Sequence, residues 1–338
     1  MEKYKPATQA DVARLAGVSQ TTVSYILNRK DSNIPEETRQ RVLAAIQELG
    51  YTPNRAARTL RTSKTHTIAC IIPEITNPFF YPVVRGIQDV AEIHEYDLMI
   101  YNSDSIEKKE RQLVRSVQKA RADGLIGMFV HLTAEDLRPL LAQGVAVTKS
   151  ELGPVDYGDL VIDSVYVDNI AASSAAVGHL IERGHRRIGM LGGASATPRG
   201  FRIRGYRQAL AEHAIAYDEA LVVGGDFTLE NGYEKMQELL ALEDRPTAVF
   251  AANDLMAIGA MQAIMDAGLS IPQDIAVMGF DNIPSAQLIT PRLSTVEHFP
   301  QLLGERAATL LFERLEGDAP QHGRSAELPF ELVLRETT

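Results

Sequence analysis

The sequence contains a single cysteine, Cys70, among its 338 residues. A disulfide within the chain is therefore excluded. The letters IACIIP around Cys70 are typical of a buried strand rather than of a reactive thiol. The N-terminal residues MEKYKPATQADVA lack the apolar core of a signal peptide, and no run of about 18 apolar residues occurs. We therefore expect neither secretion nor a membrane span, and we expect a cytoplasmic protein.

Motifs that carry catalysis or hold a cofactor are also missing from the sequence. The eight histidines are scattered, and no nucleophile–base pair or metal-ligand spacing occurs. Gly192 and Gly193 follow an apolar run, but they lack the surrounding pattern of a phosphate-binding loop. We therefore expect no enzyme activity, no metal and no cofactor.

Positive charge is scarce except at the N-terminus. Residues 1–64 carry 11 Lys and Arg against 6 Asp and Glu, a balance of +5, whereas the remaining 23 and 38 give −15. A basic head on an acidic body can hold the head against a polyanion while the body stays away from it. The length suggests more than one domain. We expect a head at 1–52, a linker at 53–65 and a body at 66–338.

The head has the pattern of three short helices. Thr8 and Asp11 can cap the first helix, Gly17 can turn the chain with a positive φ, and Ser19 can cap the second helix. A third helix is expected between Pro35 and Gly50. The expected core residues are Val12, Ala13, Leu15, Ala16, Val23, Ile26, Leu27, Val42, Ala45, Ile46 and Leu49.

Polar side chains of the second helix face outward in this pattern. They are Gln20, Thr21, Ser24 and Tyr25. Gln and Thr suit hydrogen bonds to base edges in the major groove. The pattern thus predicts a helix-turn-helix that binds double-stranded DNA. A generic three-helix bundle with a polar surface is the alternative.

The same segment resembles the LacI/GalR family of bacterial transcription regulators, whose signature is D-V-A-x-x-A-G-V-S-x-x-T-V-S-x-x-L-N. The matching residues are Asp11, Val12, Ala13, Ala16, Gly17, Val18, Ser19, Thr22, Val23, Ser24, Leu27 and Asn28. The resemblance implies that Gln20, Thr21 and Tyr25 contact operator bases. It implies that Thr22, Ser24 and Asn28 hold phosphates and register. We add Thr8, Ser19 and Tyr51 to the DNA-binding set.

The segment after the head resembles the hinge of this family, with the pattern Y-x-P-N-x-x-A-x-x-L. Its matching residues are Tyr51, Pro53, Asn54, Ala57 and Leu60. A segment of about eight residues is too short for a stable isolated helix. The resemblance implies that two copies pair in the minor groove, with the leucine as a wedge. It implies phosphate or groove contacts for Arg55, Arg58 and Arg61. Packing of the leucine within a linker is the alternative.

The body alternates apolar strands with amphipathic stretches, which predicts an α/β fold with mostly parallel strands in two sheets. The expected strands are Ile68–Ile72, Leu98–Tyr101, Gly124–Phe129, Val145–Val147, Ile188–Leu191, Leu221–Val223, Ala248–Ala251 and Ile275–Gly279. Ligands of such sheets bind beyond the carboxyl ends of strands. Polar residues at these ends are binding candidates, namely Asn77, Asp104, Asn253 and Asp281.

The resemblance extends through the body in the motifs NPFF, ADGLIG, VDN, GHRRIGMLGG, RGYRQAL, ANDLMAIGA and VMGFDN. It implies a two-lobed body like that of periplasmic binding proteins, with a ligand cleft. We expect one lobe at about 66–166 and 296–325, and the other at about 167–295 and 326–338. The effector residues that the resemblance implies are Arg202, Asn253 and Asp281, with Phe227 and either Phe79 or Phe80 as aromatic walls. His298 falls where a polar effector residue is expected, and Asn77 and Asp104 remain candidates from their positions after strands. Amide and carboxylate groups beside an apolar platform suit a sugar.

Several of these residues have a structural alternative. Asp254 is expected to cap a helix, and Asn253 and Asp281 can be turn residues. Arg202 can pair with an acidic surface residue, and His298 can lie in an exposed loop. Lys149 either lies near the cleft, where it would favour an acidic or phosphorylated effector, or is exposed.

These features predict a ligand-responsive transcription repressor. A homodimer would bind a nearly palindromic operator, and a sugar-like inducer would release it. The alternatives are a regulator that needs a corepressor and senses a nucleobase, a phosphorylated metabolite or a protein partner, and a solute-binding component of transport. The DNA-binding head and the lack of a signal peptide argue against transport.

Overall fold

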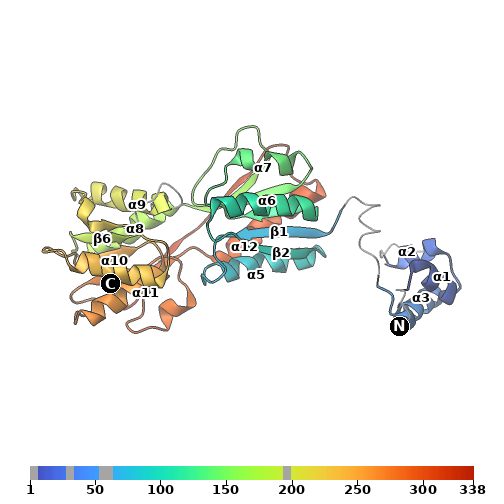
Figure 1. The fold of residues 1–338 in the computed structure, drawn as a ribbon, viewed down its shortest axis with the longest axis horizontal. Coiled ribbons are helices and arrows are strands. Elements are labelled where there is room, and N and C mark those ends of the chain that lie inside the picture. Colours follow the sequence, from blue (N-terminus) through green and yellow to red (C-terminus); the bar gives the residue numbers. More distant parts are fainter. Residues whose placement is uncertain (1–6, 28–33, 53–63, 193–198) are drawn as a thin grey trace. The chain divides into compact units, whose positions relative to one another are not determined.

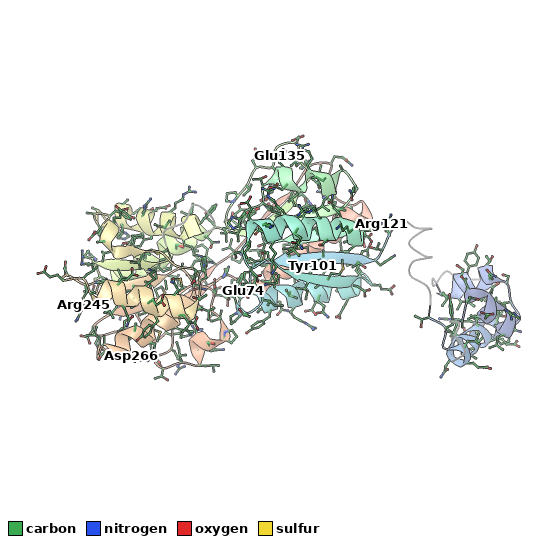
Figure 2. All side chains as sticks on the ribbon, viewed as in Figure 1. Glu74, Tyr101, Arg121, Glu135, Arg245 and Asp266 are labelled. Atoms are coloured by element: carbon green, nitrogen blue, oxygen red, sulfur yellow. The ribbon has the colours of Figure 1, made fainter. Side chains whose placement is uncertain are left out.

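The computed structural model describes residues 7–27, 34–52, 64–192 and 199–338. The chain divides into two compact units, Met1–Thr65 and His66–Thr338, here called the head and the body (Figure 1). Figure 2 shows the side chains of the described residues. Within these ranges no helix combines the length and the apolar character that a membrane span requires.

The head consists of α1 (Gln9–Ala16), α2 (Gln20–Leu27) and α3 (Glu36–Leu49). Thr8 and Asp11 form the expected capping box. Gly17 ends α1 with a φ of 66°, and the hydroxyl of Ser19 accepts a hydrogen bond from the Thr22 amide at 3.0 Å. The two caps and the glycine turn between α1 and α2 are thus those that the sequence predicts.

One small core holds the three helices together. Its fully buried members are Val12, Val23 and Val42, one from each helix. The placement of Leu15 in this core is wrong, because its side chain is 46% exposed. The turn of α1 that buries Val12 and Ala16 leaves Leu15 on the outer side.

The first lobe of the body is a six-stranded parallel sheet in the order β11-β5-β4-β3-β1-β2. Its strands are β1 (Thr67–Ile72), β2 (Asp97–Asn102), β3 (Gly124–Gly127), β4 (Ala146–Glu151), β5 (Asp163–Val167) and β11 (Ser325–Leu328). Four helices cover its two faces, namely α5 (Phe80–Ile93), α6 (Glu107–Ala120), α7 (Ala134–Leu141) and α12 (Pro300–Glu316).

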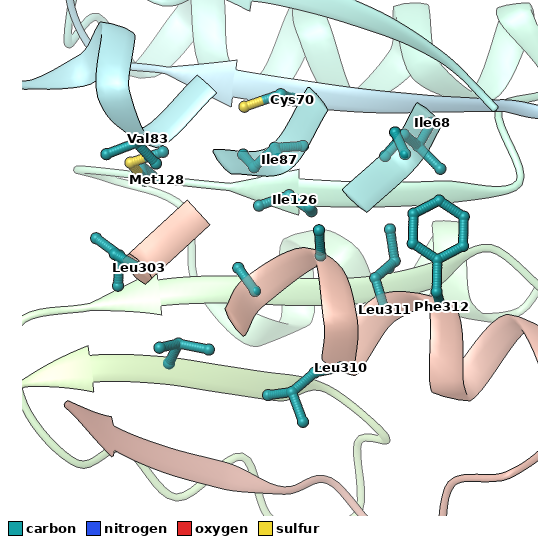
Figure 3. Close-up of a cluster of buried hydrophobic side chains, with 14 of the residues drawn as sticks. Ile68, Cys70, Val83, Ile87, Ile126, Met128, Leu303, Leu310, Leu311 and Phe312 are labelled. Carbon is teal, nitrogen blue, oxygen red and sulfur yellow. The ribbon is translucent and has the colours of Figure 1, made fainter. Parts of the chain in front are cut away.

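Alternate residues of β1 supply the cores on the two faces of this sheet. Ile68 and Cys70 pack with Ile87 of α5 and Leu311 of α12 (Figure 3). Ala69 and Ile71 pack on the other face, with α6 and α7. Cys70 is fully buried, and burial raises the pKa of its thiol to about 12, which confirms a packing role.

The second lobe is a four-stranded parallel sheet in the order β7-β6-β8-β9. Its strands are β6 (Ile188–Leu191), β7 (Val222–Val223), β8 (Ala248–Ala251) and β9 (Ala276–Met278). Its helices are α8 (Asn169–Glu182) and α9 (Arg199–Glu212) on one face, and α10 (Leu229–Leu240) and α11 (Asp254–Asp266) on the other. Short 3-10 turns occur at Glu219–Leu221 and Pro284–Gln287.

The chain passes between the lobes after β5, after β10 (Thr295–Glu297) and before β12 (Glu331–Val333). β10 and β12 form a separate antiparallel ribbon. The expected lobe boundary at 325 is wrong by a few residues, because β11 pairs with β5 through Leu328 and Val167. The C-terminal segment FELVLRETT has the pattern of a last strand and contains β12. The sequence pattern missed β5, β10 and β11, whose short, mixed polar and apolar runs carry a weak strand pattern.

Asp163 at the start of β5 joins three parts of the first lobe. Its carboxylate is fully buried and accepts hydrogen bonds from Arg314 of α12 at 2.7 and 2.8 Å. It also accepts them from the backbone amide of Arg324 at 2.8 Å and from the Arg324 guanidinium. Burial raises the pKa of Asp163, but the hydrogen bonds from both arginines outweigh burial, and the pKa lies below its usual value.

This arrangement predicts a pH dependence. A carboxylate with a lowered folded-state pKa adds stability above the unfolded pKa of about 3.9, and that stability is lost as the pH falls through the folded value. We expect Asp163→Asn to lower the free energy of unfolding at neutral pH, and we expect its difference from the native protein to shrink below about pH 4. Urea unfolding at a series of pH values measures this difference. A difference that stays constant with pH would contradict the prediction.

Candidate effector site and DNA-reading surface

Arg202 of α9 lies at the centre of a buried polar cluster in the second lobe. Its Nε donates to Asn169 Oδ1 at 3.0 Å, its Nη2 donates to Asp281 Oδ1 at 3.3 Å, and its Nη1 donates to the Ala252 carbonyl. Burial lowers the pKa of Arg202, and the charge of Asp281 opposes this shift. The alternative of a surface pair for Arg202 is wrong, because both members of the pair are buried.

Aromatic rings surround this arginine. The guanidinium carbon lies 3.8 Å from the centroid of Phe280 and 5.9 Å from that of Phe227. Such cation–π contacts are strongest in desolvated sites. The combination of hydrogen-bonding groups and ring faces provides both kinds of surface that a sugar or a flat heterocycle needs.

Asp281 and His298 extend the cluster toward the first lobe. His298 Nε2 lies 3.1 Å from Asp281 Oδ1, and its ring stacks on Phe79 with centroids 4.6 Å apart and planes 3° apart. Phe79 in turn meets Phe80 edge-on at 5.0 Å. The alternative of an exposed loop histidine is wrong, because only 4% of His298 is exposed. The fold therefore brings Arg202, Asp281, His298 and Phe79 together.

Asn253 is the N-cap of α11, as the structural alternative allowed. Its Oδ1 accepts from the Met256 amide at 2.9 Å, and its Nδ2 donates to the Phe227 carbonyl at 3.0 Å. The backbone of Phe227 has a φ of 71°, so this bond holds a strained turn beside the ring. Asn253 is thus joined to the cluster through the Phe227 backbone.

The expectation that Asp254 caps a helix is wrong, because Asn253 already occupies the N-cap. Asp254 is fully buried and accepts hydrogen bonds from Thr295 Oγ1 at 2.6 Å and from the Ile283 amide at 2.9 Å. Burial and then the charge of Asp281 raise its pKa well above the usual value. Asp254 therefore fixes the loop that carries Asp281.

Other predicted effector residues have different partners. Asn77 Oδ1 accepts from the Phe79 amide at 3.0 Å, which orients the aromatic pair. Asp104 follows β2, is exposed and pairs with Asn102 and Lys109 within the first lobe. These contacts do not join Asp104 to the Arg202 cluster.

Lys149 of β4 is buried, so the alternative of an exposed lysine is wrong. Its Nζ lies 2.7 Å from Glu151 Oε1, and the Tyr157 hydroxyl donates to the same oxygen. The rings of Phe129 and Tyr157 lie 5.9 and 5.2 Å from the ammonium. The Lys149 ammonium is therefore paired with the Glu151 carboxylate within the first lobe.

The sequence pattern did not indicate Asn169 or Phe280 as members of this site. Asn169 follows β5, a strand that the pattern also missed, and only 1% of it is exposed. Had DSVYV been read as a strand, the rule that ligands bind beyond carboxyl ends would have selected Asn169. Phe280 is an apolar residue and is fully buried, so its type indicates a core position and not a contact with Arg202.

The second helix of the head presents the predicted DNA-reading side chains. Gln20, Thr21 and Tyr25 are exposed, Tyr25 by 49%, whereas Ser24 is half-buried. The backbone carbonyl of Gln20 accepts from Gln9 Nε2 at 2.9 Å, which joins α2 to α1. The helix is therefore held with a polar face free for contact.

The remaining DNA-binding candidates fall into two groups. Thr8 and Ser19 cap helices, Thr22 Oγ1 lies 2.9 Å from Ser19 Oγ, and the ring of Tyr51 packs on the head core. Burial raises the pKa of Tyr51. The others lie outside the described residues, namely Asn28, Asn54, Arg55, Ala57, Arg58, Leu60 and Arg61.

Comparison with known proteins assigns both units. Residues 8–54 match the family model "Bacterial regulatory proteins, lacI family", and residues 177–338 match "Periplasmic binding protein-like domain". The HTH-type transcriptional repressor PurR of Photobacterium profundum is 36% identical over 338 residues, with 98% of each chain covered. This chain belongs to the LacI family of bacterial regulatory proteins. The prediction of a helix-turn-helix transcription regulator is confirmed.

Solved structures of LacI-family proteins share the fold. A Lac repressor dimer bound to operator and the anti-inducer ONPF matches with a TM-score of 0.86 and 27% identity, covering 98% of this chain and 99% of that one. The complex of the transcriptional regulator CelR with cellobiose matches with a TM-score of 0.73 and 30% identity, covering 98% and 100%. The predicted head and two-lobed parallel α/β body are confirmed.

Proposed function

We propose that this protein is a repressor that binds a nearly palindromic operator as a homodimer and leaves it when an uncharged, sugar-like molecule occupies the Arg202 cluster. The observation that carries the proposal is the buried set of Arg202, Asn169 and Asp281 beside the aromatic rings, in a chain with a LacI-type head. The Lac repressor dimer on its operator supports the assembly, because a two-fold protein matches a palindrome.

The pairing of charges supports an uncharged effector. Among the described residues, Arg202 pairs with Asp281, and Lys149 of the first lobe pairs with Glu151. A phosphorylated ligand would have to displace one of these carboxylates, which leaves a buried charge unpaired. Sugar hydroxyls can instead share the amide and carboxylate oxygens. The complex of the related CelR with cellobiose agrees with this ligand class.

A regulator that needs a nucleobase as corepressor is the second candidate. The observation in its favour is the parallel stack of Phe79 and His298, because a flat heterocycle can replace one ring of such a stack. Thermal unfolding of the full-length protein with ribose, cellobiose, their phosphates and nucleobases separates the two candidates, because a bound ligand raises the melting temperature. Operator affinity with each stabilising ligand then shows release or tightening, by about 5–150-fold.

No enzymatic turnover is part of this proposal, since the cluster joins its polar groups to one another rather than to a nucleophile. Incubation of the full-length protein with cellobiose should return the sugar unchanged. Formation of glucose would count against a purely regulatory role.

The exposed face of α2 gives a direct test of DNA reading. Gln20→Ala should change the preferred base at one operator position, because a good side-chain contact to a base edge discriminates by about 1–3 kcal/mol. Binding to random duplexes should change little. Selection from randomised duplexes followed by fluorescence anisotropy measures both quantities.

Gln40→Ala is the matched control, since Gln40 lies exposed on α3 and bonds to Glu36 of its own helix. We expect it to leave the base preference unchanged. If Gln20→Ala selects the same operator as the native protein, base reading by Gln20 is wrong.

A further inference from the structure

Asn282 follows Asp281 in the chain, but its side chain joins the segments that cross between the lobes. Its Nδ2 donates to Glu297 Oε2 at 2.8 Å, and its Oδ1 accepts from Arg335 Nη2 at 2.6 Å. Its backbone is left-handed, with a φ of 50°, a conformation that Asn and Asp adopt more readily than other residues with a side chain. The effector loop is thus tied to β10 and to the segment after β12.

Glu297, the last residue of β10, carries this link to the first lobe. Its second oxygen, Oε1, accepts from the Phe299 amide at 2.5 Å. Phe299 is the N-cap of α12, and its carbonyl accepts from the Leu303 amide at 2.9 Å. One carboxylate therefore holds the effector loop with one oxygen and the start of α12 with the other.

α12 cannot move at its start without moving α5. A Cβ on Gly304 would lie 2.0 Å from the Val83 carbonyl oxygen, and one on Gly86 would lie 2.2 Å from the Gln301 carbonyl oxygen. The two backbones are thus in direct contact at these glycines. Phe79 and Phe80, at the start of α5, belong to the effector site.

We infer that Asn282 and Glu297 are positioning residues that transmit the position of the effector loop in the second lobe to α12 and α5 in the first. The biological consequence rests on the proposed function, because effector binding at Asp281 would act on this link. The link itself is a property of the body and is present without any effector. It complements the direct contact from Asp281 through His298 to Phe79.

The donor and the acceptor of the hydrogen bond between Asn282 and Glu297 can be exchanged by substitution, which tests the inference. Asn282→Asp keeps the acceptor for Arg335 but places a second carboxylate against Glu297. The double variant Asn282→Asp/Glu297→Gln restores both bonds with donor and acceptor exchanged, because Gln can donate to Asp and still accept from the Phe299 amide. Gln287→Glu is the control, since it adds the same charge to an exposed position of the same loop.

Hydrogen–deuterium exchange of the full-length protein measures the outcome without a ligand. In Asn282→Asp we expect amides of residues 299–305 to exchange about tenfold faster, the size expected when a hydrogen bond to a charged acceptor is lost. Peptides of α10, in the same lobe as Asn282, should be unchanged. The double variant should return residues 299–305 to the native rate, and Gln287→Glu should match the native protein throughout.

Faster exchange confined to residues 281–290 would overturn the inference, because the role of Asn282 would then be local. Faster exchange that persists in the double variant would also overturn it. Glu297→Gln alone loses one of the two bonds and should accelerate residues 299–305 by a smaller factor. These outcomes do not depend on which effector binds, so a failed effector screen and a failed link are distinguishable.

Discussion

Replacing Arg202 by leucine is expected to lower the free energy of unfolding of the body by about 3–5 kcal/mol, the range for removal of one partner from a buried ion pair. Only 7% of Arg202 and 5% of Asp281 are exposed. Leucine would leave the Asp281 carboxylate without its cation and leave the Asn169 amide oxygen and the Ala252 carbonyl without a donor.

Urea unfolding of the full-length protein measures this loss. Arg207→Leu is the matched control on the same helix, because Arg207 is exposed and contacts Tyr217, and it should change the free energy by less than about 1 kcal/mol. Adding Asp281→Asn to the leucine variant removes the unpaired charge and should recover part of the loss. An Arg202→Leu protein as stable as Arg207→Leu would show that the buried pair contributes nothing.

Arg202→Leu is also expected to change the release of the protein from its operator. Under the proposed function, the leucine variant that remains folded should stay on its operator when the effector is added, because the hydrogen bonds that orient Asn169 and Asp281 are gone. Anisotropy with operator DNA measures this at a temperature well below the melting point. Normal release would remove Arg202 from the effector site while leaving its role in stability intact.

Replacing Glu110 by alanine is expected to cost at least about 3 kcal/mol, because hydrogen bonds to a charged group contribute about 1.5–3 kcal/mol each. Glu110 of α6 is fully buried and accepts from three consecutive backbone amides, those of Val130, His131 and Leu132, at 2.7, 3.0 and 3.1 Å. These amides belong to the loop after β3, at the carboxyl end of the sheet. Alanine would leave all three without their acceptor.

Two variants on the same helix complete this test. Glu110→Gln keeps one accepting oxygen and should lose less stability than alanine. Glu107→Ala removes an exposed carboxylate that pairs with Arg111, and such surface pairs contribute about 0–1 kcal/mol. Equal melting temperatures for Glu110→Ala and Glu107→Ala would refute the anchoring role.

Most of the head could be predicted from its sequence because its determinants are local. The Thr8–Asp11 capping box spans four residues, and Gly17 needs only its own φ to turn the chain. The prediction that Leu15 is buried was wrong, because helical periodicity alone does not say where the apolar face of a helix ends. In the body, apolar strands such as β1 and β8 were predictable, whereas the short β10 was not, because it forms through pairing with β12.

The buried cluster around Arg202 could be predicted in its residue types and only partly in its contacts. The fold brings Arg202, Asp281 and His298 together, as their grouping predicted, but the role of Asp254 was misjudged because the preceding asparagine is the better-placed cap. Asn169 was missed with its strand.

The sequence by itself determined the family, the helix-turn-helix with its caps, and the separation of a basic head from an acidic body, because these depend on residue type and short spacing. Only the tertiary structure decided the partners of the buried charges. Arg202 meets Asn169 across 33 positions and Asp281 across 79, and Arg324 meets Asp163 across 161. Such meetings depend on strand order and chain crossings, and a buried charge accepts whichever opposite group the fold brings within hydrogen-bonding distance.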